Sequence, residues 1–136
     1  MTVGWREFVA VAVGGVIGTS IRLAADALIP QEATGFPVST LVVNIVGAFV
    51  LGVLVSSIWT RLRTPNWLKA GLGTGMLGSF TTFSAFVTSL LTEATHGMWW
   101  LAIAYLLASL MLGFAAATLG IRVGHRLPPE PDLVDE

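Results

Sequence analysis

The chain has 136 residues, of which 54% are hydrophobic and only 11% are charged, and its formal net charge is -1. An average soluble domain has about 25% charged residues, so this composition excludes an ordinary soluble protein and predicts an integral membrane protein. There is no cysteine, and the two histidines, His96 and His125, fall at the ends of apolar stretches. Disulfides, thiolate metal sites and a Cys/His catalytic pair are therefore excluded, and we do not expect an enzyme.

Four apolar stretches each reach the roughly 20 residues that a helix needs to cross the hydrocarbon core of a bilayer. We therefore expect an all-α membrane protein with four transmembrane helices, at residues 8–29, 38–59, 68–91 and 98–121. Residues 1–126 then form a single transmembrane unit. The proline-rich, acidic tail at residues 127–136 is expected to be disordered.

The basic residues lie almost entirely on one side of these four predicted spans. Six of the seven fall beside the termini or in the second loop: Arg6, Arg61, Arg63, Lys69, Arg122 and Arg126. Because loops rich in Lys and Arg stay in the cytoplasm, both termini are predicted to be cytoplasmic. The opposite loops are expected to hold Glu32, Glu93 and His96, with no basic residue.

The first span has small residues at Gly14 and Gly18, one helical turn apart, and Arg22 continues the same face. Such a small-xxx-small pair allows close approach of another helix. An arginine in a span costs several kcal/mol unless it snorkels or pairs, and Asp26 is an available partner one turn further on. We expect Arg22 to hold the fold or to concentrate anions in a vestibule, rather than to bind a ligand directly.

The second span places Thr40, Asn44, Gly47 and Leu51 along one helical face. Asn44 is the only Asn or Gln within any predicted span. Its side chain either forms an interhelical hydrogen bond, which this residue taken alone favours, or offers two N–H donors to a dehydrated anion or substrate.

The third span contains the most unusual stretch of the chain, the glycine-rich segment at residues 71–86. Glycine weakens a helix, and in lipid the freed backbone groups must still find partners. We therefore predict that the third helix is broken near the centre of the membrane, where it is buried in protein or lines a wet path. Polar groups and aromatic rings meet there, namely Ser79, Thr81, Thr82 and Ser84 with Phe80, Phe83 and Phe86.

The fourth span begins with Trp99 and Trp100 and then presents one continuous face, made of Tyr105, Ser109, Leu112, Ala116 and Gly120. Small residues also recur at Ser109, Gly113 and Ala117, which predicts close helix contact. The Tyr105 hydroxyl needs a hydrogen-bond partner and is positioned to donate into a pore.

Three groups of residues, at 14–22, 40–49 and 75–86, resemble the Fluc fluoride channels, also called the CrcB family, in order, spacing and overall length. The third group is the most specific of the three. The resemblance implies an antiparallel dimer in the bacterial inner membrane, which exports cytoplasmic fluoride passively and gives fluoride resistance. It also implies two fluoride pores along the subunit interface and a structural sodium ion, Na+, at its centre.

By the same resemblance, the backbone carbonyls of Gly78 and Thr81 from both subunits would hold the sodium ion. Phe83 and Phe86 would be the pore aromatics and Asn44 a pore amide donor. The polar track would include Thr82, Ser84 and Tyr105. Ala85 stands where the family often has threonine, so the path is expected to depend more on Ser84 and Thr82.

Two questions stay open from the sequence. The one-sided charge suggests a single fixed orientation, so the dimer partner is either a second copy or an opposite-topology homologue. The other function classes are a small drug-proton antiporter, which needs a membrane carboxylate, and a non-transporting assembly subunit. Asp26 is the only acidic residue inside a predicted span and lies near its end, which argues against the antiporter.

Overall fold

The computed structural model describes residues 4–29, 35–61 and 63–127, and these residues contain helices and no strands. Four helical segments are long and apolar enough to cross a membrane, which confirms the predicted all-α membrane fold. The first is α1 (Trp5–Leu28), the second is α2 (Val38–Ser56) and the fourth is α6 (Trp99–His125). The third is a composite of α3 (Asn66–Ala70), the π-helical η1 (Gly71–Leu77), α4 (Gly78–Phe80) and α5 (Phe83–Thr95).

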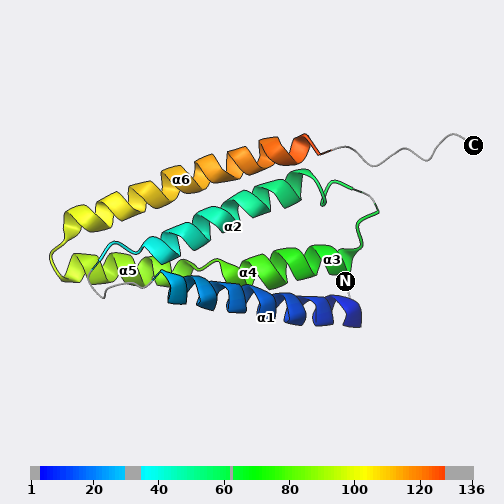
Figure 1. The fold of residues 1–136 in the computed structure, drawn as a ribbon, viewed down its shortest axis with the longest axis horizontal. Coiled ribbons are helices and arrows are strands. Elements are labelled where there is room, and N and C mark those ends of the chain that lie inside the picture. The colour runs from blue at the N-terminus through cyan, green and yellow to red at the C-terminus, as the bar shows by residue number, and fades with distance from the viewer. Residues whose placement is uncertain (1–3, 30–34, 62, 128–136) are drawn as a thin grey trace, which may run out of the picture.

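The four segments form two packed pairs (Figure 1). Helix α1 lies along α3, η1 and α4, and α2 lies along α6. Helix α5 then contacts α6 and connects the two pairs. The start of α1 and the end of α6 lie at the same end of the bundle, as an even number of spans requires.

Small residues allow the close approach within each pair. A Cβ atom at Gly14 would overlap the carbonyl oxygen of Gly71, and one at Gly18 would overlap that of Met76. The predicted contact role of Gly14 and Gly18 is therefore confirmed, with η1 as their neighbour. Gly120 approaches Phe49 in the α2–α6 pair in the same way.

The small residues of α6 are not all used in this way. Nothing lies within 4 Å of the Cβ position at Gly113, so that residue does not serve a contact within the described chain. The predicted stripe of Ser109, Gly113 and Ala117 is thus not a packing seam along its whole length. Its far end does pack closely, where the carbonyl oxygen of Ala117 lies beside Gly52 of α2.

The third segment is interrupted at two residues only. Thr81 (φ -76°, ψ 156°) and Thr82 (φ -145°, ψ 122°) are extended, and α5 begins directly after them. The glycines before this point do not interrupt the helix. Gly71, Gly73 and Gly75 lie in η1, whose backbone packs against α1, and Gly78 begins α4. A π-helical stretch inside a helix often accompanies a functional site.

The helix ends differ from the predicted bounds in two places that bear on function. Helix α2 stops at Ser56, where the hydroxyls of Ser56 and Ser57 bond to carbonyls of the preceding turn. The third segment continues to Thr95, so Glu93 lies inside α5 and is only 2% exposed, whereas we expected it in an outer loop. Residues 128–136, most of the predicted tail, lie outside the described residues.

Candidate functional site

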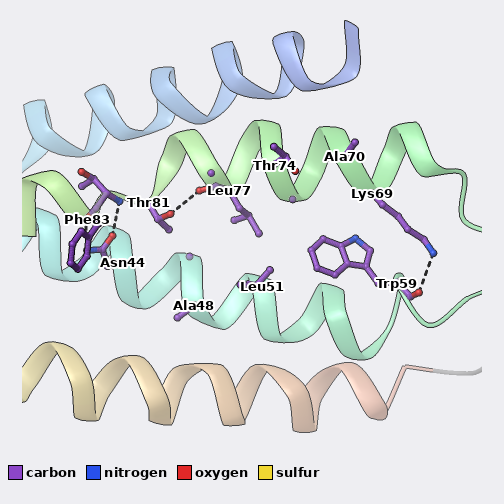
Figure 2. A pocket seen from close by; sticks show the side chains of 14 residues that line it. Asn44, Ala48, Leu51, Trp59, Lys69, Ala70, Thr74, Leu77, Thr81 and Phe83 are labelled. Carbon is purple, nitrogen blue, oxygen red and sulfur yellow. Dashed lines mark hydrogen bonds between the residues drawn. The ribbon is translucent and has the colours of Figure 1, made fainter. Parts of the chain in front are cut away.

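An open groove of about 840 Å³ runs between α2 and the third segment (Figure 2). We call it the α2 groove. One wall comes from α2, the other comes from η1, α4 and the two extended threonines, and Trp59 and Lys69 close one end. The predicted residues that line it are Asn44, Gly78, Thr81, Thr82 and Phe83. Five of the predicted site residues, drawn from two separate spans, thus meet at a single surface.

Asn44 pairs with the backbone at the helix interruption. Its Nδ2 donates to the carbonyl oxygen of Thr82 at 3.0 Å, and its Oδ1 accepts from the Thr82 backbone N–H at 2.9 Å. The side-chain amide therefore supplies both hydrogen bonds that an extended residue would otherwise exchange with a neighbouring strand. The interhelical reading of Asn44 is the one this geometry supports, and one N–H of its amide remains beyond this pair.

The backbone carbonyls of Gly78 and Thr81 are at the same interruption. The Thr82 N–H, which a continuous helix would donate to the Gly78 carbonyl oxygen, instead donates to Oδ1 of Asn44. The Thr81 N–H donates to the carbonyl oxygen of Leu77 at 3.0 Å. Among the described residues, neither carbonyl oxygen accepts a hydrogen bond outside the helical ladder. Both residues line the α2 groove. Unpaired carbonyl oxygens are suitable ligands for a hard cation such as Na+.

Four aromatic rings follow one another from this groove into the core. Phe83 is 77% exposed, and its ring lies 5.9 Å from that of Phe86. The Phe86 ring lies 5.3 Å from Tyr105, and Tyr105 meets Phe36 edge-on at 5.5 Å. The three predicted pore rings are thus brought together. Phe36, in the connection before α2, is an addition that the sequence pattern did not reveal.

A second, more polar groove of about 390 Å³ lies between α1, α2 and α5. We call it the Arg22 groove. Its predicted members are Arg22, Thr40, Thr82 and Ser84. Asp26 also lines it, but the described residues contain no ion pair between Arg22 and Asp26. Asp26 instead accepts a hydrogen bond from the hydroxyl of Ser39.

Thr82 is the residue that the two grooves share. Its hydroxyl oxygen accepts from the Ala85 backbone N–H and lies 3.2 Å from the Ser84 hydroxyl oxygen. Thr82 is therefore the N-cap of α5, and its hydroxyl satisfies one of the free N–H groups of the first turn. Asn44 holds its backbone from the other side. Thr82, at the helix interruption, thus lines both the α2 groove and the Arg22 groove.

Tyr105 lies away from both grooves. Its side chain is fully buried, and its hydroxyl and that of Ser109 have no hydrogen bond of good geometry in the described chain. Both carboxylate oxygens of the buried Glu93 are also without a partner there. A single subunit therefore offers no open path at Tyr105. Because Glu93 lies within α5, in the third span, our argument that Asp26 is the only carboxylate inside a span is wrong.

The sequence reasoning also missed two hydroxyls of the Arg22 groove, Thr88 and Ser89. Thr88 follows Ser84 by four residues, so the two lie on one face of a helix. That spacing was a usable signal. The two residues were not predicted because the glycine-rich segment was taken to end at Phe86.

No group of three or more His, Cys, Asp or Glu side chains that could hold a metal is present in the described parts of the chain. A cation at this site would therefore depend on backbone and hydroxyl oxygens. Such oxygens are typical ligands of hard, weakly acidic cations and not of zinc or copper.

Known proteins give an independent comparison. Residues 9–121 match the family described as "CrcB-like protein, Camphor Resistance (CrcB)". A relative named "Fluoride-specific ion channel FluC 1" from Mycolicibacterium paratuberculosis is 37% identical over 123 residues, covering 90% of this chain and 93% of the relative. "Fluoride-specific ion channel FluC" from Deinococcus radiodurans is 42% identical over 118 residues, covering 85% and 93%. The protein of that name from Roseiflexus sp. is 37% identical over 123 residues, covering 90% and 99%.

Proposed function

Because this chain belongs to the CrcB-like family, we propose that it is a subunit of a fluoride-specific ion channel, through which fluoride leaves the cytoplasm passively. The relatives with this named function match the chain over most of its length. The single observation that carries the proposal further is that Thr82, at the helix interruption, lines both grooves. Hydroxyls, the Asn44 amide and the exposed ring of Phe83 lie beside this one interruption of a membrane span, which supports the proposal.

These groups suit a small, strongly hydrated anion. A pore for fluoride must replace lost water with donors, which here are hydroxyl O–H, amide N–H and the positive edges of aromatic rings. We assign the pore to Asn44, Thr82, Phe83, Ser84 and Phe86, with Tyr105 next in the series of rings. Conduction requires sites that admit an ion without retaining it, and weak ring-edge donors meet that need.

The sodium ion is part of the same proposal. The carbonyl oxygens of Gly78 and Thr81 would hold Na+ together with their counterparts in a second subunit. One chain supplies two such residues, and a second subunit would raise the number of carbonyl ligands to four. Bound there, the ion would satisfy carbonyls that the interrupted helix leaves unpaired in the membrane.

The second subunit would occupy the α2 groove in an antiparallel orientation. This groove holds the proposed sodium ligands and the exposed ring of Phe83, so the site is incomplete without a partner. The one-sided basic residues favour a fixed orientation in the bacterial inner membrane with cytoplasmic termini. A second copy inserted the opposite way and an opposite-topology homologue are both consistent with this arrangement.

The test is passive anion efflux from liposomes that contain the purified protein, with fluoride compared with chloride. We expect rapid, fluoride-selective efflux that Phe83→Ile abolishes. Phe114→Ile is the matched control, because Phe114 of α6 is similarly exposed, at 72%, and lines neither groove. The control should conduct like the wild type.

Three other outcomes are informative. Efflux only after an opposite-topology homologue is added identifies a heterodimer. No efflux with any partner, from protein that is folded and dimeric, overturns the channel proposal. Transport that needs a proton gradient would favour the antiporter, for which Asp26 and Glu93 are the available membrane carboxylates.

A further inference from the structure

A third groove, of about 540 Å³, lies at the opposite end of α1 from the Arg22 groove, between the start of that helix and α3. We call it the interfacial groove. Its residues take no part in the site described above, and they are Trp5, Arg6, Val9, Ala10, Val13 and Trp67. Figure 1 places the start of α1 beside α3, at the end of the bundle that holds both described termini. The groove therefore lies where a membrane span meets the headgroup region.

The floor of this groove is an apolar stripe. Trp5, Val9 and Val13 recur every four residues on one face of α1 and are 76%, 39% and 54% exposed. Eight residues of helix cover about 12 Å, so the stripe extends from the interface well into the acyl region. Trp67 of α3 forms the facing wall and is 41% exposed. The groove thus has an apolar floor on α1 and a tryptophan wall on α3.

Arg6 provides a positive charge at the interfacial groove. Arg6 is exposed and forms no ion pair within the described part of the chain. The neighbouring carboxylate of Glu7 is turned toward Gly4 at the start of the helix. The nearby Lys69 is already engaged, because its ammonium donates to the carbonyl oxygen of Trp59 at 3.1 Å. Arg6 is therefore the cation available to a ligand in the interfacial groove.

We propose that the interfacial groove binds one anionic phospholipid per subunit. The lipid phosphate would contact the guanidinium of Arg6, and an acyl chain would lie along Val9 and Val13, beside Trp67. Arginine matches the geometry of phosphate oxygens, and tryptophan is enriched at the level of lipid headgroups. Basic pockets between helices on the cytoplasmic side are suited to anionic headgroups.

The positive charge of Arg6 favours an anionic lipid over a second copy of this chain as the occupant of the interfacial groove. The described ends of the chain on this side are basic, so a copy inserted in the same orientation would bring like charge against Arg6. A copy in the opposite orientation is assigned to the α2 groove. An anionic lipid supplies the complementary charge and also covers apolar surface that faces the bilayer. This inference rests on membrane insertion and is independent of which ion the protein conducts.

The test is native mass spectrometry of the intact protein in detergent, with phosphatidylglycerol and phosphatidylcholine of the same chain length added in equal amounts. We expect the wild type to retain phosphatidylglycerol preferentially, at one molecule per subunit. Arg6→Gln should lower this preference roughly fivefold, which corresponds to about 1 kcal/mol for one basic residue near an anionic lipid. Arg122→Gln is the matched control, since Arg122 is also an exposed basic residue but lies outside the groove.

A second variant tests the apolar part of the site. Trp67→Ala should reduce retention of both lipids, because it removes one wall of the groove and leaves Arg6 in place. Equal retention of the two lipids by the wild type would overturn the proposal, and so would an equal loss in Arg6→Gln and Arg122→Gln. A change of oligomeric state in Trp67→Ala, with lipid retention unchanged, would assign the groove to another protein subunit instead.

Discussion

Asn44→Ala is the substitution that most directly tests how the helix interruption is held. It removes both hydrogen bonds to the Thr82 backbone, at 3.0 and 2.9 Å, and leaves an N–H and a C=O without their partner. An interhelical hydrogen bond in a membrane is worth about 0.6 kcal/mol, and a typical protein hydrogen bond about 1 kcal/mol. Two bonds therefore correspond to roughly 1–2 kcal/mol of stability.

The assay combines three measurements on the purified protein. Thermal unfolding in detergent should show a Tm lowered by roughly 4–8 °C. Hydrogen exchange of the backbone amides at residues 82–85 should become faster, because the extended residues lose their partner. Fluoride efflux from liposomes should fall at the same time. Asn66→Ala is the control, since Asn66 is an exposed amide at the start of α3 and should leave all three unchanged.

The three measurements separate two roles for Asn44. If efflux falls while Tm and amide exchange stay at their wild-type values, then Asn44 serves the ion directly and does not position the backbone. That result would refute the reasoning from its two hydrogen bonds. A loss of stability equal in Asn44→Ala and Asn66→Ala would refute it as well.

Two further substitutions test the surroundings of the interruption. Thr82→Ala removes the N-cap of α5 and should lower the free energy of unfolding by about 1 kcal/mol, measured by thermal unfolding. Thr82→Ser keeps the cap and should be as stable as the wild type. An equal loss of stability in both variants would argue against capping. Glu93→Leu replaces a buried carboxyl group without a hydrogen-bond partner and should raise the Tm, while a clear decrease would reveal a partner for this carboxyl in the assembled protein.

Much of the site was visible in the sequence, because its residue types are unusual for a membrane span. Asn44, Thr82 and Phe83 were singled out as polar or aromatic groups with no ordinary role in lipid, and the structure places all three at one groove. The resemblance to the CrcB family, stated from three short motifs, is confirmed by the family match over residues 9–121. Their assignment to a pore and to a sodium site stays a prediction.

Other parts of the site depend on how segments far apart in the chain come together. Phe36 joins the rings through Tyr105, which follows it by more than sixty positions, and no local pattern indicates this pairing. The position of Glu93 was misjudged for a related reason. An acidic residue lowers the hydropathy of a window and so suggests the end of a span, but α5 continues past it and buries its side chain against the bundle.

The sequence by itself determined the membrane class and the four spans, because these follow from composition and from the length of the apolar stretches. Only the tertiary structure decided where the third helix is interrupted. Glycine lowers helix stability locally, yet η1 stays helical because its backbone is packed against Gly14 and Gly18 of α1. The chain becomes extended at Thr82 instead, where the Asn44 side chain of α2 replaces the hydrogen bonds that the helix gives up.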